Sequence, residues 1–113
     1  MTSLSTVIVE LATINLAEGK TETDLIEASD KFQKTFLDHQ SGFIRRELVR
    51  NAKGGYIDIV HWRSQEDIDT LMKIIESSPE IHQYFSVMKF DPENPDEGVE
   101  HNSSLAVYEA SNK

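Results

Sequence analysis

The sequence contains no cysteine and few basic residues, with 11 lysines and arginines against 20 aspartates and glutamates. The absence of cysteine excludes disulfide bonds, thiolate nucleophiles and thiolate metal ligands. The shortage of basic residues leaves a formal net charge of −9 over 113 residues, and such a field repels phosphate groups. We therefore expect neither a nucleic-acid partner nor attachment to an anionic membrane surface.

Signals for membrane insertion, export and common cofactors are also missing from the sequence. No apolar run approaches the length of a membrane span, and Met1–Thr6 lacks the basic residues that begin a secretory signal. The default expectation is a cytoplasmic protein. No glycine-rich phosphate loop or nucleophile elbow is present. The histidines lack the spacing of metal ligands, so we expect no metal site; they are His39, His61, His82 and His101.

Hydrophobic periodicity divides the chain into strands and helices. β-branched or alternating runs predict strands, and apolar residues at steps of three and four predict helices. Thr23 is the predicted N-cap of the first helix, and Ser64 that of the second, with Asp67 completing an acidic capping box. The predicted elements are a strand over Thr6–Ile14, a helix from Thr23 that ends before Ser41, strands over Phe43–Asn51 and Tyr56–Arg63, a helix from Ser64 to Ser78 with further helical turns over Glu80–Met88, and a strand over Val99–Glu109.

The order strand, helix, strand, strand, helix, strand predicts an α+β fold of the ferredoxin-like βαββαβ class. In this class an antiparallel sheet carries helices on one face. The length fits a single domain over 1–113, with frayed termini at about 1–5 and 110–113.

The two central strands form a predicted hairpin around a glycine-rich turn. Centring the turn on Lys53–Gly54 pairs Asn51 with Tyr56 and fixes which residues share a face. The face that we assign to the helices includes Arg46 and His61. The other face mixes apolar and charged side chains, which predicts burial against a partner; it carries Phe43, Arg45, Glu47, Val49, Tyr56, Asp58, Val60 and Trp62. An exposed hairpin whose charges only maintain solubility is the alternative.

Three stretches of the chain, SGFIRRELVRN, GGYIDIVHWRSQED and SSPEIHQYF, resemble the antibiotic biosynthesis monooxygenase family of dimeric α/β barrels. The resemblance covers Thr6–Met88, and its specific parts include the Trp62-Arg63-Ser64 junction between strand and helix. It implies two ferredoxin-like subunits packed sheet to sheet, each with a small-molecule pocket between sheet and helices. Members of the family include cofactor-independent monooxygenases of quinols or polycyclic phenols, and relatives that degrade haem.

The haem-degrading branch of that family has a tryptophan in the second helix and an axial histidine after it. This sequence has Leu71 near the first position and Phe85 at the second, with His82 offset. The resemblance therefore does not imply haem degradation, and we expect no cofactor.

His61 is the predicted base of the implied pocket, because an imidazole can take the proton of a phenol or quinol hydroxyl near neutral pH. Arg46, its expected cross-strand neighbour, would stabilise the developing anion. The structural alternatives are a half-buried, hydrogen-bonded histidine and an arginine that is solvated at the sheet edge.

Four residues are predicted to contact an aromatic substrate, namely Trp62, His82, Tyr84 and Phe85. For Trp62, a structural role at the junction or the interface is the alternative. We also expect a homodimer with an isologous interface that includes Phe43, Arg45, Glu47, Asp58 and Val60. The predicted function is cofactor-independent oxygenation of a small phenolic, quinol or polycyclic aromatic substrate. A non-catalytic small-molecule-binding or stress-related dimer on the same scaffold is the alternative.

Overall fold

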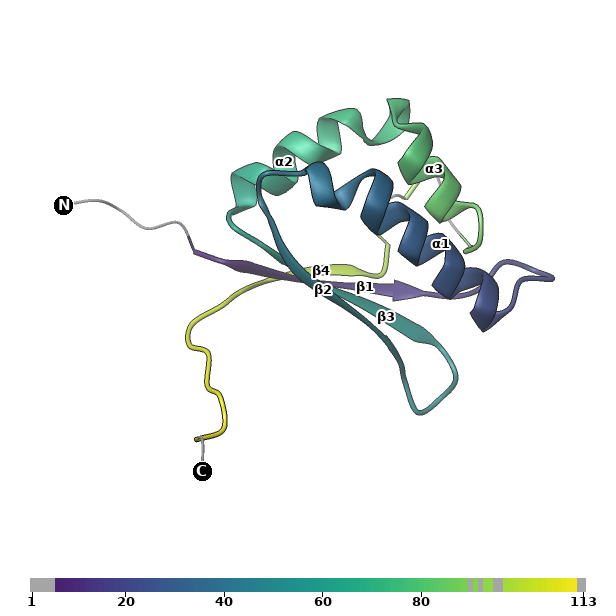
Figure 1. Ribbon diagram of the computed structural model, residues 1–113. Coiled ribbons are helices and arrows are strands. Elements are labelled where there is room, and N and C mark those ends of the chain that lie inside the picture. Colours follow the sequence, from purple (N-terminus) through teal and green to yellow (C-terminus); the bar gives the residue numbers. More distant parts are fainter. Residues whose placement is uncertain (1–5, 90, 92, 95–96, 112–113) are drawn as a thin grey trace.

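The computed structural model describes residues 6–89, 91, 93–94 and 97–111, and shows a four-stranded sheet with a layer of helices above it (Figure 1). The elements are β1 (Ile8–Ile14), α1 (Glu22–Thr35), the 3-10 helix η1 (Leu37–His39), β2 (Phe43–Arg50), β3 (Tyr56–Trp62), α2 (Gln65–Ile74), the 3-10 helix η2 (Ile75–Ser77), α3 (Pro79–Phe85) and β4 (Val99–Ser103). The strand order is β2-β3-β1-β4, and all neighbouring strands are antiparallel. This arrangement confirms the predicted ferredoxin-like α+β fold.

Helix α1 begins earlier than the sequence indicated. Its N-cap is Thr21, whose hydroxyl accepts a hydrogen bond from the Asp24 amide at 3.2 Å, while the Asp24 carboxylate accepts one from the Thr21 amide at 2.9 Å. This reciprocal capping box satisfies two backbone amides at once, so the prediction of Thr23 as the N-cap is wrong. Ser64 is the N-cap of α2 as predicted, and its hydroxyl accepts from the Asp67 amide at 3.2 Å.

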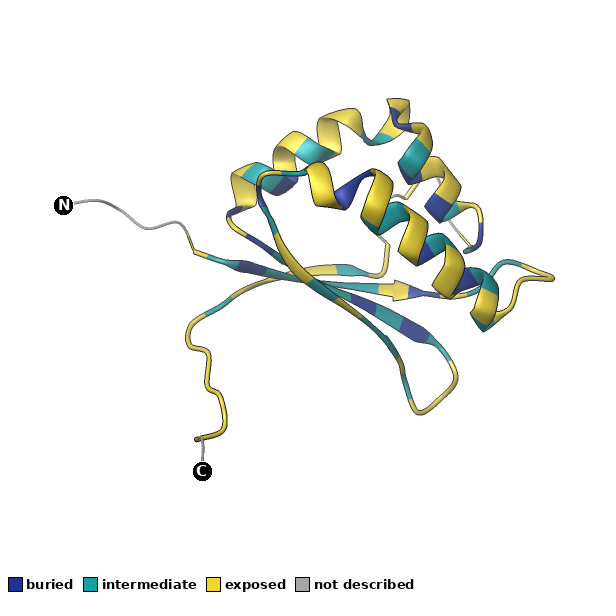
Figure 2. Cartoon of the chain, in the orientation of Figure 1, coloured by how far each residue is buried: buried dark blue, intermediate teal, exposed yellow. Residues whose placement is uncertain are grey.

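The last strand is shorter than predicted. β4 has 5 residues and ends at Ser103, because its neighbour β1 begins at Ile8, the residue that pairs with Ser103. Ser104 still donates to the Val7 carbonyl at 2.9 Å, and residues 105–111 are exposed (Figure 2). Of the predicted frayed termini at about 1–5 and 110–113, residues 110–111 are exposed coil, and 1–5 and 112–113 lie outside the described residues. No helix in the described ranges is long and apolar enough to cross a bilayer.

The register of the β2–β3 hairpin differs by one residue from the prediction. Arg50, not Asn51, pairs with Tyr56, so the turn covers residues 51–55. The Asn51 side chain explains the difference, because its Oδ1 accepts hydrogen bonds from the Lys53 and Gly55 amides at 2.8 and 3.1 Å and so belongs to the turn. The shift leaves β2 as predicted from Arg45 onward but exchanges the two faces of β3.

Alternate residues of β3 are therefore buried under the helices. Tyr56, Asp58, Val60 and Trp62 are all buried. Two groups of buried side chains fill the space between sheet and helices, one that includes Trp62 with Ile68 and Ile81, and one that includes Tyr56 with Leu25 and Tyr84. Within the described ranges, the other face of the sheet carries no helix (Figure 1).

The start of β2 and the start of α2 are packed closely against each other. The Gly42 carbonyl accepts a hydrogen bond from the Arg63 amide at 2.8 Å. A methyl group at Gly42 would collide with the side chain of Asp67, which caps α2 together with Ser64 and pairs with Arg63 at 2.7 Å. The junction that positions Trp62 thus requires glycine at this point.

We predict that Gly42→Ala lowers the free energy of unfolding by about 1–3 kcal/mol, the usual cost of overpacking. The added methyl displaces Asp67 from its cap. Urea unfolding measures the change, and the exposed neighbour Ser41→Ala is the control, with an expected effect within about 0.5 kcal/mol. Equal stability of the two variants would show that Asp67 moves aside without cost.

Candidate functional site

A cavity of about 490 Å³ lies between the sheet and the helices. Four aromatic side chains contribute to its wall: Phe32, Trp62, Tyr84 and Phe85. Aliphatic side chains from α2 and η2 complete its apolar part, including Leu71, Met72 and Ile75. The polar and charged residues of the wall are Glu10, Thr13, Asp58, Asp69, Lys89, Glu97 and His101. A wall of this kind suits a small, largely aromatic molecule with a polar substituent.

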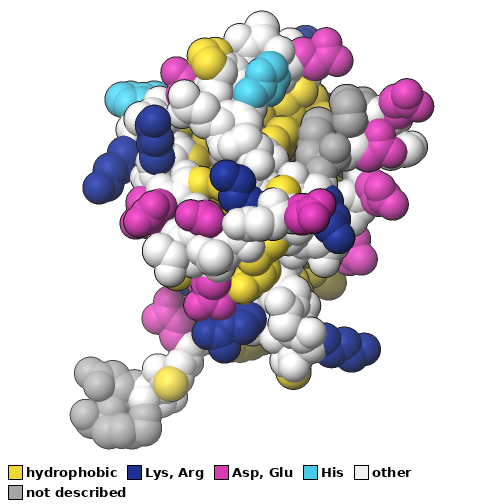
Figure 3. Space-filling model, turned by 90° about the vertical axis from the view of Figure 1, so that its right-hand side faces the viewer, with side chains coloured by type: hydrophobic (Ala, Val, Ile, Leu, Met, Phe, Trp, Pro, Cys, Tyr) yellow, Lys and Arg dark blue, Asp and Glu magenta, His cyan; other side chains and the backbone are white. Residues whose placement is uncertain are grey.

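The surface outside the cavity is strongly charged. On the face shown in Figure 3, acidic and basic side chains surround the hydrophobic side chains that are visible there. With a net charge of −9, the surface favours neutral or cationic small molecules over polyanions.

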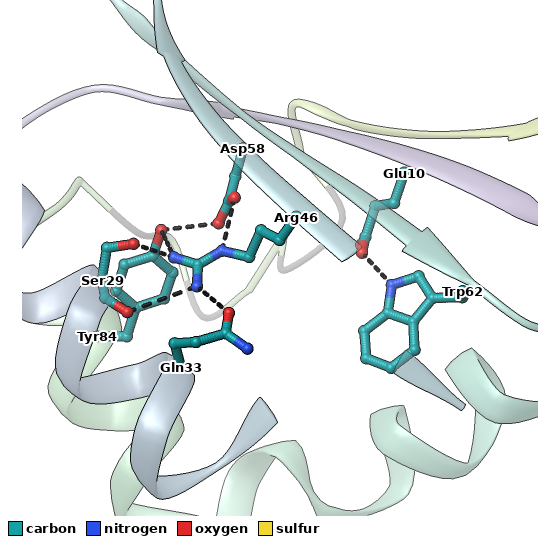
Figure 4. Close-up of polar contacts among 7 residues, drawn as sticks. All are labelled: Glu10, Ser29, Gln33, Arg46, Asp58, Trp62 and Tyr84. Atoms are coloured by element: carbon teal, nitrogen blue, oxygen red, sulfur yellow. Dashed lines mark hydrogen bonds and ion pairs between the residues drawn. The ribbon is translucent and has the colours of Figure 1, made fainter. Parts of the chain in front are cut away.

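A buried ion pair between β2 and β3 lies beside the cavity (Figure 4). Arg46 Nε donates to Asp58 Oδ1 at 2.8 Å, and the two side chains are only 5% and 6% exposed. The Tyr84 hydroxyl donates to the other carboxylate oxygen of Asp58 at 2.7 Å. The guanidinium also donates to Gln33 Oε1 at 2.9 Å and to the Ser29 hydroxyl, both on α1. The network thereby connects the sheet to α1 and α3.

Electrostatics hold this network in one protonation state. Burial and the charge of Asp58 raise the pKa of the Tyr84 hydroxyl far above its ordinary value, so the phenol stays protonated and donates. Although burial acts to lower the pKa of Arg46, the adjacent Asp58 raises it on balance. Both oxygens of Asp58 are therefore occupied by fixed donors, which makes this carboxylate a poor proton acceptor for a substrate.

The sequence placed Arg46 on the helix side, and the structure agrees. However, its guanidinium donates to Asp58, Gln33 and Ser29 and lies over the rings of Phe32 and Tyr84. It is not part of the cavity wall. Its predicted role in stabilising a substrate anion therefore has no direct geometric support.

The predicted location of His61 is wrong. The one-residue shift of the hairpin places it opposite Arg45, on the face of the sheet that carries no helix. Its Nδ1 is buried and has no hydrogen-bond partner in the described part of the chain. Burial, and to a lesser degree the charge of Arg45, lower the pKa of this imidazole. The sheet therefore separates His61 from the cavity, and His61 does not line it.

The residues predicted to contact substrate divide into two groups. Trp62, Tyr84 and Phe85 line the cavity. His82, in contrast, is exposed on α3 and lies outside the cavity wall, because α3 turns its Ile81 and Tyr84 inward instead.

The residues predicted for the dimer interface are also divided between the two faces. Asp58 and Val60 are buried on the helix side as a result of the register shift. Phe43 packs on that side too, edge-on to Trp62 at 6.0 Å between ring centroids, because a bulge between Phe43 and Arg45 reverses the alternation there. Arg45 and Glu47 do lie on the open face, where they form an exposed ion pair at 3.7 Å.

A second polar cluster in the cavity wall was missed by the sequence analysis. The Trp62 indole N–H donates to Glu10 Oε1 at 2.9 Å (Figure 4). The other oxygen of Glu10 lies 3.4 Å from His101 Nε2. Glu10 on β1 is paired directly with His101 on β4, so the two side chains share a face. The signal in the sequence was Glu10 itself, the single charge in an otherwise apolar strand.

Two residues of this wall bear on the comparison with the haem-degrading branch. Within the described ranges, no group of three or more His, Asp or Glu side chains could hold a metal ion. Leu71 and Phe85, which occupy the positions where the haem-degrading branch has tryptophan and histidine, both line the cavity and offer no ligand atom.

Comparison with known proteins identifies the fold. No protein-family model matches the chain, and no curated protein matches its sequence. Among solved structures, the chain is similar to SnoaB, a cofactor-independent oxygenase from Streptomyces nogalater, with 13% identity, a TM-score of 0.64, and coverage of 93% of this chain and 97% of SnoaB.

Two further solved structures have TM-scores close to that of SnoaB. A haem-degrading protein from Mycobacterium tuberculosis has 13% identity and a TM-score of 0.62, covering 94% of this chain and 99% of that one. A Bordetella bronchiseptica protein assigned to the antibiotic biosynthesis monooxygenases has 18% identity and a TM-score of 0.60, covering 92% and 100%. The chain thus has the ferredoxin-like fold of the antibiotic biosynthesis monooxygenases and their structural relatives.

We predict that Asp58→Ala lowers the free energy of unfolding by about 3–5 kcal/mol, because it leaves the buried guanidinium of Arg46 without its counter-charge. Tyr84→Phe, which removes one hydrogen bond, should cost about 1–3 kcal/mol. Urea unfolding measures both, and Arg50→Ala, which breaks the exposed pair with Glu22, is the control with an expected cost below about 1 kcal/mol. Similar values for Asp58→Ala and Arg50→Ala would contradict a stabilising role for the network.

Proposed function

We propose that the protein is a cofactor-independent monooxygenase that oxidises a small phenolic, quinol or polycyclic aromatic molecule in the 490 Å³ cavity. The observation that carries the proposal is the wall itself, which combines the Trp62, Phe32 and Tyr84 rings with carboxylates and an imidazole. The similarity in fold to a cofactor-independent oxygenase supports the same reaction class.

The chemistry requires an electron-rich substrate whose hydroxyl can be ionised. A base removes the hydroxyl proton, and the resulting anion passes an electron to dioxygen. With an anthrone, one oxygen atom replaces the two hydrogens of the ring CH₂ group and the other oxygen leaves with them as water, so the substrate supplies all the electrons. A pocket that excludes bulk water protects the reactive intermediates.

Non-catalytic binding of a small aromatic molecule is the second candidate function. It is favoured by the position of His61 on the open face of the sheet and by the full set of protein partners around Arg46. The two candidates share the cavity and differ only in whether dioxygen is consumed.

We expect the protein to consume dioxygen with at least one member of a panel of quinols and anthrones, without added metal, flavin or reductant. Ala12→Leu, which fills part of the cavity, should reduce uptake by at least tenfold. Its matched control is Ala52→Leu in the exposed hairpin turn, which should leave uptake unchanged. An oxygen electrode measures the rates. Tight binding without uptake for the whole panel would establish the binding function instead.

We also propose that the protein is a homodimer joined through the open face of its sheet. The alternation that buries Trp62 turns Ile57 and Ile59 of β3 outward, beside Leu11 of β1 and Val49 of β2. All four of these side chains are half-buried in the single chain, and no helix of the described residues covers them. The buried and unpartnered Nδ1 of His61 lies on the same face. A second copy would cover this apolar surface and could supply the missing partner.

Light scattering should therefore give twice the 12.8 kDa mass of one chain at micromolar concentration. Ile59→Asp, which places a charge in the centre of the open face, should shift the mass to that of a monomer while circular dichroism stays unchanged. Ile26→Asp is the matched control, since Ile26 is an exposed isoleucine on α1 that is 46% accessible. A monomer in the wild type, or a dimer that Ile59→Asp does not affect, would contradict this interface.

A further inference from the structure

We infer that Glu10 and His101 form the proton-accepting pair of the cavity, held in position by Trp62, and that they select aromatic ligands with an acidic hydroxyl group. This inference rests on the proposed function, and it replaces His61 as the base. Two other groups are excluded from that role by geometry: His61 lies on the opposite face of the sheet, and Asp58 already accepts from Arg46 and Tyr84.

The hydrogen bonds fix which atom of the pair can accept a proton. An ionised carboxylate only accepts hydrogen bonds, so the nitrogen that approaches Glu10 Oε2, His101 Nε2, is the one that carries hydrogen. The lone pair of the neutral imidazole is then on Nδ1. Among the described residues, His101 contacts Glu10 through Nε2, and His101 lines the cavity, so we assign Nδ1 as the atom that accepts the proton of a substrate hydroxyl.

Trp62 acts on the pair as a positioning residue. Its side chain is 3% exposed, and its N–H donates to Glu10 Oε1 at 2.9 Å. The carboxylate is therefore held on one oxygen by a buried ring, which directs the other oxygen toward His101. The distance of 3.4 Å between Glu10 and His101 shortens when the imidazole becomes charged, since the contact then joins opposite charges.

The proton-transfer step breaks one bond and forms one bond. The O–H bond of the ligand breaks, an N–H bond forms at His101 Nδ1, and the electron pair stays on the ligand oxygen. Glu10 stabilises the imidazolium through the Nε2–H. The resulting aromatic anion is the species that reduces dioxygen in the proposed function. The His101 side chain is 32% exposed, so solvent can remove the proton after each turnover.

The surroundings of the pair are mostly acidic. The other charged groups in the same wall are Asp58 on β3, Asp69 on α2, and Lys89 and Glu97 in the segments before and after the loop that leads to β4. Carboxylates therefore outnumber the single lysine, so the wall suits a ligand that arrives neutral and gives its hydroxyl proton to the pair. Binding of an ionisable phenol should be favoured over binding of its methyl ether.

The experiment separates proton transfer from oxygen chemistry. 4-Nitrophenol, whose anion is yellow, is bound to the full chain under nitrogen, and the bound anion is measured by visible absorbance across the pH range. We expect the wild type to bind the nitrophenolate form, and His101→Gln to reduce the bound anion at least tenfold at pH 7. Glu10→Gln should reduce the bound anion less than His101→Gln does, and Trp62→Phe should reduce it less than Glu10→Gln does. His39→Gln, which changes an exposed histidine on η1, is the matched control and should equal the wild type.

Two further measurements complete the test. Added imidazole should restore the bound anion in His101→Ala, a rescue that a purely structural role would not show. With any substrate that is oxidised, His101→Gln should lower kcat roughly 10²–10⁴-fold, the usual contribution of a general base, while His39→Gln leaves it unchanged.

The experiment distinguishes failure of this inference from failure of the proposed oxygenase function. If His101→Gln and the wild type bind the same amount of nitrophenolate, or if 4-nitrophenol does not bind to the wild type, the inference is overturned even when dioxygen is consumed. If the bound anion depends on His101 but no substrate is oxidised, the inference stands and the oxygenase function is rejected.

Discussion

The buried contact between Arg46 and Asp58 is the constraint on which the rest of the site depends. It joins β2 to β3, and through Ser29, Gln33 and Tyr84 it attaches both α1 and α3 to the sheet. A charge pair that is this deeply buried is costly unless every polar atom around it has a partner. Here the partners come from three different elements, so the network fixes how far the helices stand from the sheet and leaves space for the cavity beside it.

The fold could be predicted from the sequence, because the signals for it are repeated along the chain. Each strand and helix has its own periodicity, and Ser64 marks the start of α2 by a local capping interaction. These features depend on residues that are close in the chain. The error at Thr23 has the same origin, since two threonines lie within reach of the helix start and only the tertiary structure shows that Thr21 accepts the cap.

The candidate site was harder to predict, because it depends on one residue of register in the hairpin. The side chain of Asn51 accepts two backbone amides and lengthens the turn. This change reverses the faces of β3, so His61 leaves the cavity and Asp58 enters it. Glu10 and His101 are 91 positions apart in the sequence, and no local pattern relates them. Only the pairing of β1 with β4 brings them together.

Trp62 is the single tryptophan of the chain, and it lies in the wall of the cavity with its indole N–H bonded to Glu10. All indole fluorescence of the protein therefore originates at the site itself. An aromatic guest that stacks near this ring would quench the emission, and a change in the hydrogen bond to Glu10 would shift its wavelength. The protein thus carries a built-in optical reporter of occupancy, which allows a library of compounds to be screened without any knowledge of the reaction.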